Sequence, residues 1–135
     1  MSDKGFNEKI YVKSNGNPDF IVSHMETGQV VAVECKFRSR FSKDKKSHEA
    51  VFTHFGEEKK INRYWKYQTE KEIAVFILLG VGGLAEQPDN LYLLTLDDIN
   101  AIKTKDNDRF DNVRTVRKRL EPYKISEYEL IDYLF

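Results

Sequence analysis

Cysteine is almost missing from this sequence, with Cys35 the single example in 135 residues. No disulfide can form within the chain, so we expect a protein of a reducing compartment, the cytoplasm. Long apolar runs are also missing: the longest, Ile73 to Leu79, is far shorter than the roughly 20 residues of a transmembrane helix. The polar first residues contain no apolar secretory signal, and we therefore expect a soluble protein with no membrane partner.

An excess of charge of one sign is missing as well, because Lys plus Arg and Asp plus Glu number 22 each. A strongly basic chain would indicate nucleic-acid binding from charge alone, whereas here that inference must depend on local clusters. The hydrophobic share of 40% is sufficient for a folded core, which excludes a disordered chain. The length fits one domain over residues 1–135.

The first half of the chain has the pattern of strands followed by a helix. Three β-branched or aromatic runs predict strands at residues 10–12, 20–22 and 30–37. Turn signals at 15–18 and 26–29 separate these runs, so we expect an antiparallel meander. Residues 38–56 are polar and basic and are predicted to be a loop. Residues 57–69 are predicted to be helical, because Ile61, Tyr64, Trp65 and Gln68 recur at the spacing of one helix face.

The second half continues with strands and ends on a helix. The apolar run 73–79 is typical of a central strand covered on both faces, and 91–96 predicts another strand. Residues 80–90 are predicted to be a loop; their G-x-G-x-x-A pattern resembles a dinucleotide-binding turn, but Pro88 follows too soon for the required helix. Asp97 or Asp98 can cap a short helix through Ile102, and 126–129 fits a capping box before a final helix. This order indicates an α/β or α+β class with a mixed sheet.

A group of charged residues interrupts the apolar strand 30–37. Side chains alternate along a strand, so Glu34 and Lys36 share one face with the small Ala32, while the other face contains Val31, Val33, Cys35 and Phe37 and is the predicted core face. Asp19 opens the preceding strand after a turn and can reach the side of Glu34. Two adjacent carboxylates repel each other, and a divalent cation between them removes that repulsion. Carboxylate oxygens suit Mg²⁺ or Mn²⁺, which can activate water against a phosphodiester, and Lys36 could orient that water or stabilise the charge that develops on the phosphate.

Pro18-Asp19 and Glu34-Cys35-Lys36 on adjacent predicted strands resemble the PD-(D/E)XK nuclease superfamily, and the resemblance covers roughly residues 8–96. It implies an α/β fold with a restriction-endonuclease-like mixed central sheet flanked by helices. It also implies that Asp19 and Glu34 hold the metal with the backbone carbonyl of Cys35, and that Lys36 is the catalytic lysine. Many members have a glutamine on the next helix that faces the site, and Gln68 fits this role. The implied activity is that of a divalent-metal-dependent endonuclease acting on DNA, for which a homodimer would allow both strands to be cut.

Two further features affect this interpretation. The superfamily usually has a helix before the first strand, whereas only residues 1–10 precede Tyr11, so that helix is curtailed or the chain is part of a longer protein. Basic residues follow the motif and are predicted to bind phosphates of nucleic acid, with a solvated loop as the alternative: Arg38, Arg40, Lys43, Lys45 and Lys46. The alternative function is a catalytically inactive nuclease-like fold that binds nucleic acid or acts as a scaffold. Retention of Asp19 and Glu34 favours the enzyme, because carboxylates repel phosphate unless a cation intervenes.

Overall fold

The predicted meander at the start of the chain is present in the computed structural model, which describes residues 10–38, 58–105 and 120–135. Strands β1 (Ile10–Ser14), β2 (Phe20–His24) and β3 (Val30–Arg38) are antiparallel neighbours. In their register Phe20 lies opposite Val33. Continuing this register by one step brings Asp19, directly before β2, opposite Glu34, and residues opposite each other in a sheet project to the same face.

The remaining strands of the sheet follow the helix α3 (Glu58–Lys71) in the sequence. The remaining elements follow in chain order: β4 (Ala74–Leu84), β5 (Gln87–Thr95), α4 (Leu96–Lys105), η2 (Glu121–Tyr123), β6 (Lys124–Ile125), η3 (Glu127–Glu129) and α6 (Leu130–Leu134). The six strands form one mixed sheet in the order β1-β2-β3-β4-β5-β6. β3 and β4 are parallel, as expected for strands joined through a helix, and the other neighbours are antiparallel. The α/β class and the mixed sheet flanked by helices are therefore confirmed.

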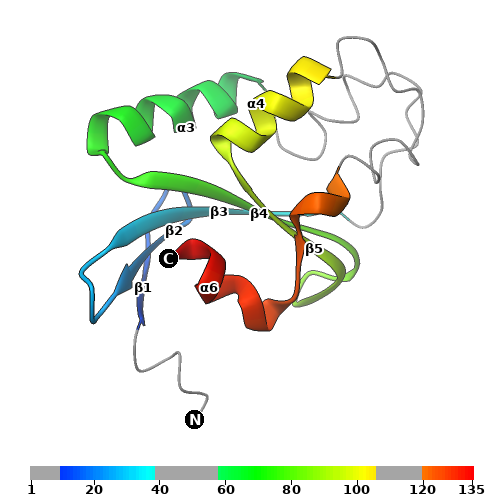
Figure 1. Ribbon diagram of the computed structural model, residues 1–135, viewed down its shortest axis with the longest axis horizontal. Helices are drawn as coiled ribbons and strands as arrows, with labels where there is room; N and C mark the ends of the chain where they lie inside the picture. The colour runs from blue at the N-terminus through cyan, green and yellow to red at the C-terminus, as the bar shows by residue number, and fades with distance from the viewer. Residues whose placement is uncertain (1–9, 39–57, 106–119) are drawn as a thin grey trace.

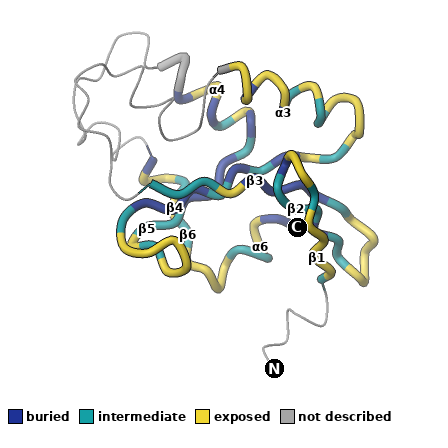
Figure 2. The backbone as a smooth tube through the Cα atoms, turned by 180° about the vertical axis from the view of Figure 1, so that it is seen from behind, coloured by how far each residue is buried: buried dark blue, intermediate teal, exposed yellow. Residues whose placement is uncertain are grey.

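Helices cover both faces of this sheet (Figure 1). α3 and α4 lie on one face, where Ala32, Ile61 and Ile77 belong to a large buried cluster. α6 lies on the other face, where Leu134 packs in a second cluster with Val31 and Val33. Burial along the chain follows the sheet and the inward sides of these helices (Figure 2). None of the described helices is long and apolar enough to span a membrane.

The assignment of a single core face to β3 was wrong in part. Val31 and Val33 are buried as predicted, but Ala32 on the opposite face is 0% exposed and Glu34 is only 7% exposed. The reason is that α3 covers the second face, so the charged residues of β3 lie under a helix. Cys35, predicted to be in the core, is exposed.

The predicted loop at 80–90 was also wrong. β4 and β5 continue through this segment as a long hairpin in which Val81 pairs with Asn90 and Leu84 pairs with Gln87. Gly82 and Gly83 have φ angles of 82° and 70°, a left-handed conformation that glycine adopts without strain. The glycines therefore twist a strand, and the segment leads into another strand instead of the helix that a dinucleotide-binding turn requires.

The helix starts in the second half are fixed by side-chain caps. The Thr95 amide donates to Asp98 Oδ2 at 2.9 Å, and the Asp98 amide donates to Thr95 Oγ1 at 3.0 Å. α4 thus starts at Leu96, two or three residues earlier than a cap at Asp97 or Asp98 predicts, with Thr95 rather than an aspartate as its cap. The predicted capping box before the last helix is confirmed, since Ser126 and Glu129 bond each other reciprocally.

Candidate active site

The carboxylates of Asp19 and Glu34 each accept a hydrogen bond from the backbone of the other residue's segment. The Asp19 amide donates a hydrogen bond to Glu34 Oε1 at 3.0 Å, and the Cys35 amide donates to Asp19 Oδ2 at 3.0 Å. Each strand therefore orients the carboxylate of the other. This reciprocal arrangement brings the two predicted metal ligands together, and it exists because Asp19 stands opposite Glu34 where pairing between β2 and β3 ends.

Glu34 is the buried charged residue of the described chain and has three polar partners. The first is the Asp19 amide. The second is the Lys36 ammonium, which lies 3.3 Å from Glu34 Oε2. The Lys36 side chain is 13% exposed and the Glu34 side chain 9% exposed. The third partner is Tyr64 of α3, whose hydroxyl is hydrogen bonded to Glu34. A buried carboxylate requires such compensation, because an unpaired charge away from water is strongly destabilising.

Tyr64 is the residue of this site that the sequence did not reveal. It is 2% exposed and belongs to the large core cluster, as the periodicity of its helix predicts. Its pKa is raised first by burial, then by the hydrogen bond to Glu34 and by the negative charges of Glu34 and Asp19. The phenol therefore keeps its proton and acts as a donor to Glu34 at any ordinary pH. A hydroxyl-bearing side chain on the inward face of the helix was the available signal.

Gln68 points inward from α3, as its place on the apolar face predicts. Its Oε1 accepts a hydrogen bond from the Val75 amide at 2.9 Å, at the start of β4. Val75 pairs with Ala32, whereas Glu34 pairs with Ile77, so this contact lies two residues before the level of the carboxylates. The structure thus brings Asp19, Glu34 and Lys36 together and ties Gln68 to the neighbouring strand.

The donor set at Asp19 and Glu34 fits a hard divalent cation. Among the residues that the structure describes, no three His, Cys, Asp or Glu side chains form a metal-binding group, so side chains contribute two carboxylates. In a β-strand the amide and the carbonyl of one residue point to the same side of the strand. The Cys35 amide points to Asp19. Its carbonyl is therefore directed to the same side. Two carboxylates and a carbonyl, completed by water, suit Mg²⁺, which is commonly held by one or two carboxylates.

The Cys35 thiol gives a separate prediction. Its pKa is raised from 9.0 to about 11, mainly by partial burial and to a lesser extent by the charges of Asp19 and Glu34. At pH 8 the thiolate fraction is expected to be about a hundred times lower than for a thiol with a pKa of 9.0. Alkylation by iodoacetamide should rise steeply with pH up to about 11. Asp19→Asn should shift this profile to lower pH, and an unshifted profile would contradict the electrostatic coupling of the two residues.

Only the first of the predicted phosphate-binding residues lies within the described chain. Arg38 ends β3, is partly buried and donates from its guanidinium to the Phe37 carbonyl at 2.9 Å. It follows Lys36 by two residues and therefore projects to the same face of the strand. The others lie outside the described residues: Arg40, Lys43, Lys45 and Lys46.

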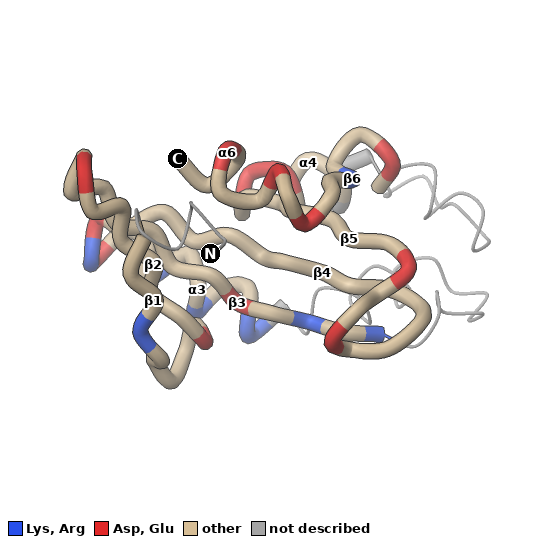
Figure 3. Tube along the Cα trace, turned by 90° about the horizontal axis from the view of Figure 1, so that it is seen from below, with Lys and Arg blue, Asp and Glu red and all other residues tan. Residues whose placement is uncertain are grey.

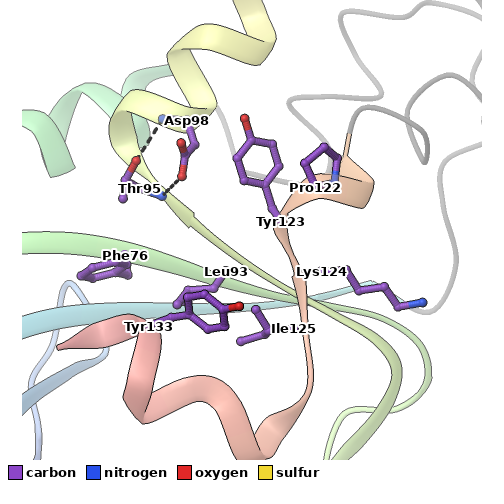
Figure 4. Close-up of a pocket in the computed structure, with 9 residues that line it drawn as sticks. All are labelled: Phe76, Leu93, Thr95, Asp98, Pro122, Tyr123, Lys124, Ile125 and Tyr133. Carbon is purple, nitrogen blue, oxygen red and sulfur yellow. Dashed lines mark hydrogen bonds between the residues drawn. The ribbon is translucent and has the colours of Figure 1, made fainter.

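A cavity of about 230 Å³ lies away from these residues, beside β5, β6 and α6 (Figure 4). Phe76, Leu93 and Tyr133 contribute to its apolar wall, and Asp98 and Tyr123 contribute polar groups. The pKa of Tyr123 is raised by burial and by the charge of Asp98. None of the predicted site residues within the described ranges lines this cavity, and the carboxylate pair lies on strands nearer the opposite edge of the sheet.

Comparisons with known proteins bear on the fold. No protein-family model matches the chain. No curated protein matches it in sequence. Among solved structures, the chain is similar to Hjc of Archaeoglobus fulgidus, a Holliday junction resolvase from an archaeal hyperthermophile, with 7% identity and a TM-score of 0.45. The match covers 69% of this chain and 70% of that chain. Similarity at this level concerns overall architecture alone, so the function must be argued from the residues of this chain.

Proposed function

We propose that this chain is a divalent-metal-dependent endonuclease that hydrolyses phosphodiester bonds in DNA. The observation that carries the proposal is the pair of carboxylates, Asp19 and Glu34, held reciprocally beside Lys36. Replacing a buried ion pair by apolar residues of similar size is often neutral or stabilising, so folding alone gives little reason for these charges. A site that must bind a cation and a phosphate does give one.

In this proposal each residue has a separate role. Asp19, Glu34 and the Cys35 carbonyl hold Mg²⁺ or Mn²⁺, which when bound supplies Lewis acidity for attack on the phosphodiester. Lys36 stabilises the negative charge that develops on the phosphate. Tyr64 positions Glu34, and Gln68 acts indirectly by fixing the start of β4, which runs beside β3. We further propose a cytoplasmic enzyme that acts as a homodimer when both strands of a duplex are cut.

Cleavage of labelled single- and double-stranded DNA with Mg²⁺ or Mn²⁺ tests this proposal. We expect metal-dependent cutting by the parent and a loss of at least about a hundredfold in Lys36→Ala, since one charge-stabilising group contributes that much. Lys66→Ala is the matched control, because Lys66 is 74% exposed on the outer side of α3 and only pairs with Glu70 at 4.0 Å. A folded parent that binds DNA without cutting it would favour the inactive binding module instead.

Metal binding itself gives an independent prediction. At millimolar Mg²⁺ or Mn²⁺ the melting temperature is expected to rise, because a ligand that binds only the folded state stabilises it by mass action. At a hundred times the dissociation constant the gain is about 2.7 kcal/mol. Asp19→Ala should abolish this rise, whereas Glu70→Gln, which removes an exposed carboxylate, should preserve it. Equal metal responses in both variants would exclude Asp19 as a ligand.

A further inference from the structure

The helix that covers the site has cations on the flank nearest the carboxylates. Lys60, Tyr64, Tyr67 and Lys71 recur at intervals of four, three and four, and residues at such intervals share one face of a helix. Arg63 lies between this row and the outer side of α3, which contains Lys66 and Glu70. Tyr64 is the buried member and is bonded to Glu34, so its neighbours in the row lie along the side of α3 that faces the site. We call Lys60, Arg63, Tyr67 and Lys71 the α3 basic flank.

The flank is close enough to the site to act on it electrostatically. Arg63 directly precedes Tyr64 in α3, and the Tyr64 hydroxyl is hydrogen bonded to the Glu34 carboxylate. The Arg63 guanidinium is therefore close enough to offset part of the negative charge of Glu34 and Asp19. A positive charge there reduces the repulsion between these carboxylates and an incoming phosphate.

With respect to the described part of the chain, the cations of the flank are available to a ligand. Lys60, Arg63 and Lys71 are exposed, and no carboxylate within the described ranges forms an ion pair with them. The pair between Lys66 and Glu70 belongs to the outer side of the same helix. Figure 3 shows Lys and Arg positions along α3 and at the end of β3, with the acidic positions of η3 and α6 on the other side of the sheet. A chain with a formal net charge of zero therefore concentrates positive charge beside its carboxylate pair.

We propose that the α3 basic flank binds the phosphate backbone of the nucleic-acid strand that enters the site, and that Tyr67 stacks against one of its bases. The inference rests on the proposed function and names the surface that holds its substrate. From Lys60 to Lys71 the helix spans roughly 16 Å, which corresponds to the axial rise of about five phosphates along one strand of a duplex, and to fewer along an extended single strand. Tyr67 lies between the cations, partly buried against the core cluster and partly exposed, which places it beside a strand bound along the flank.

Binding of a fluorescein-labelled single-stranded oligonucleotide, followed by anisotropy in EDTA, measures this contact without cleavage. Each of Lys60→Ala, Arg63→Ala and Lys71→Ala is expected to lower the slope of log affinity against log salt concentration by about 0.7, and the triple variant by about 2. Lys66→Ala removes the same charge from the outer side of α3 and should leave the slope unchanged. A triple variant with the slope of Lys66→Ala, or a parent that does not bind, overturns the inference.

Tyr67 is tested with two substitutions that keep its packing. Tyr67→Phe should bind like the parent, and Tyr67→Leu should bind single strands roughly tenfold more weakly, because stacking requires an aromatic ring. Equal affinities for both variants would contradict a stacking role.

The failure of the proposed function and the failure of this inference are distinguishable. Binding that depends on the flank without metal-dependent cleavage removes the enzyme and leaves the inference, whereas cleavage with unaltered binding in the triple variant removes the inference and leaves the enzyme.

Discussion

Glu34→Gln is expected to abolish metal-dependent cleavage and to destabilise the protein more than any exposed carboxylate substitution. Glutamine preserves the volume and an oxygen that accepts the Asp19 amide, so the change isolates the negative charge. Without that charge a divalent cation loses a ligand, and activity should fall by more than about a hundredfold, since even indirect metal contacts are commonly worth that much. The Lys36 ammonium, 3.3 Å from Glu34 Oε2, would also lose its buried counter-ion, which typically costs about 3–5 kcal/mol.

A double-mutant cycle separates the two effects. Lys36→Met removes the ammonium that Glu34→Gln leaves unpaired, so the double variant should recover part of the stability lost by Glu34→Gln and none of the activity. The exposed pair of Lys66 and Glu70 is the control, because its atoms are 4.0 Å apart and such pairs contribute about 0–1 kcal/mol. Urea unfolding of the two cycles provides the comparison. Additive losses at Glu34 and Lys36 would contradict their coupling, and retained cleavage in Glu34→Gln would exclude this residue as a metal ligand.

The proximity of Asp19 and Glu34 could be predicted from sequence because it depends on rules that act locally. Alternation along β3 puts Glu34 and Lys36 on one face, and the turn signals fix an antiparallel neighbour that Asp19 directly precedes. The hydrogen bonds between the two strands confirm that these residues meet. The motif therefore specifies the geometry through pairing register alone, without requiring knowledge of the rest of the fold. Their roles in metal binding and catalysis remain proposals.

Contacts that depend on tertiary packing could not be predicted in this way. Helical periodicity shows that Tyr64 faces inward, but the distance between its hydroxyl and Glu34 depends on how α3 lies across β3. The same crossing ties Gln68 to Val75 instead of the carboxylates. The exposure of Cys35 has a related cause, because α6 on that face of the sheet is a short helix, Leu130–Leu134, that packs with Val31 and Val33.

Tyr64→Phe is expected to reveal how far this helix contact supports the site. The substitution keeps the ring in the core and removes one hydroxyl that donates to a buried carboxylate. Hydrogen bonds to charged groups contribute about 1.5–3 kcal/mol, and we expect a loss of that size in the free energy of unfolding near neutral pH. Affinity for Mn²⁺ should fall by about 10–100-fold, because Glu34 loses a partner that orients it. Tyr67→Phe is the control, since Tyr67 is on the same helix and no hydrogen bond joins it to Glu34 within the described chain.

The pH dependence of unfolding gives Tyr64 a signature of its own. Folding raises its pKa above the ordinary value of 10.0, so the folded protein binds this proton more tightly than the unfolded chain. The associated stability is fully present below about pH 10 and is lost as the pH rises above it, because the unfolded chain then gains by releasing the proton. Cys35 contributes a similar loss between pH 9.0 and about 11, and both variants retain this residue. Tyr64→Phe should therefore show a shallower alkaline decline than Tyr67→Phe. Parallel declines would mean that the Tyr64 hydroxyl does not sense the charges of Glu34 and Asp19, and its role in positioning the carboxylate would have to be abandoned.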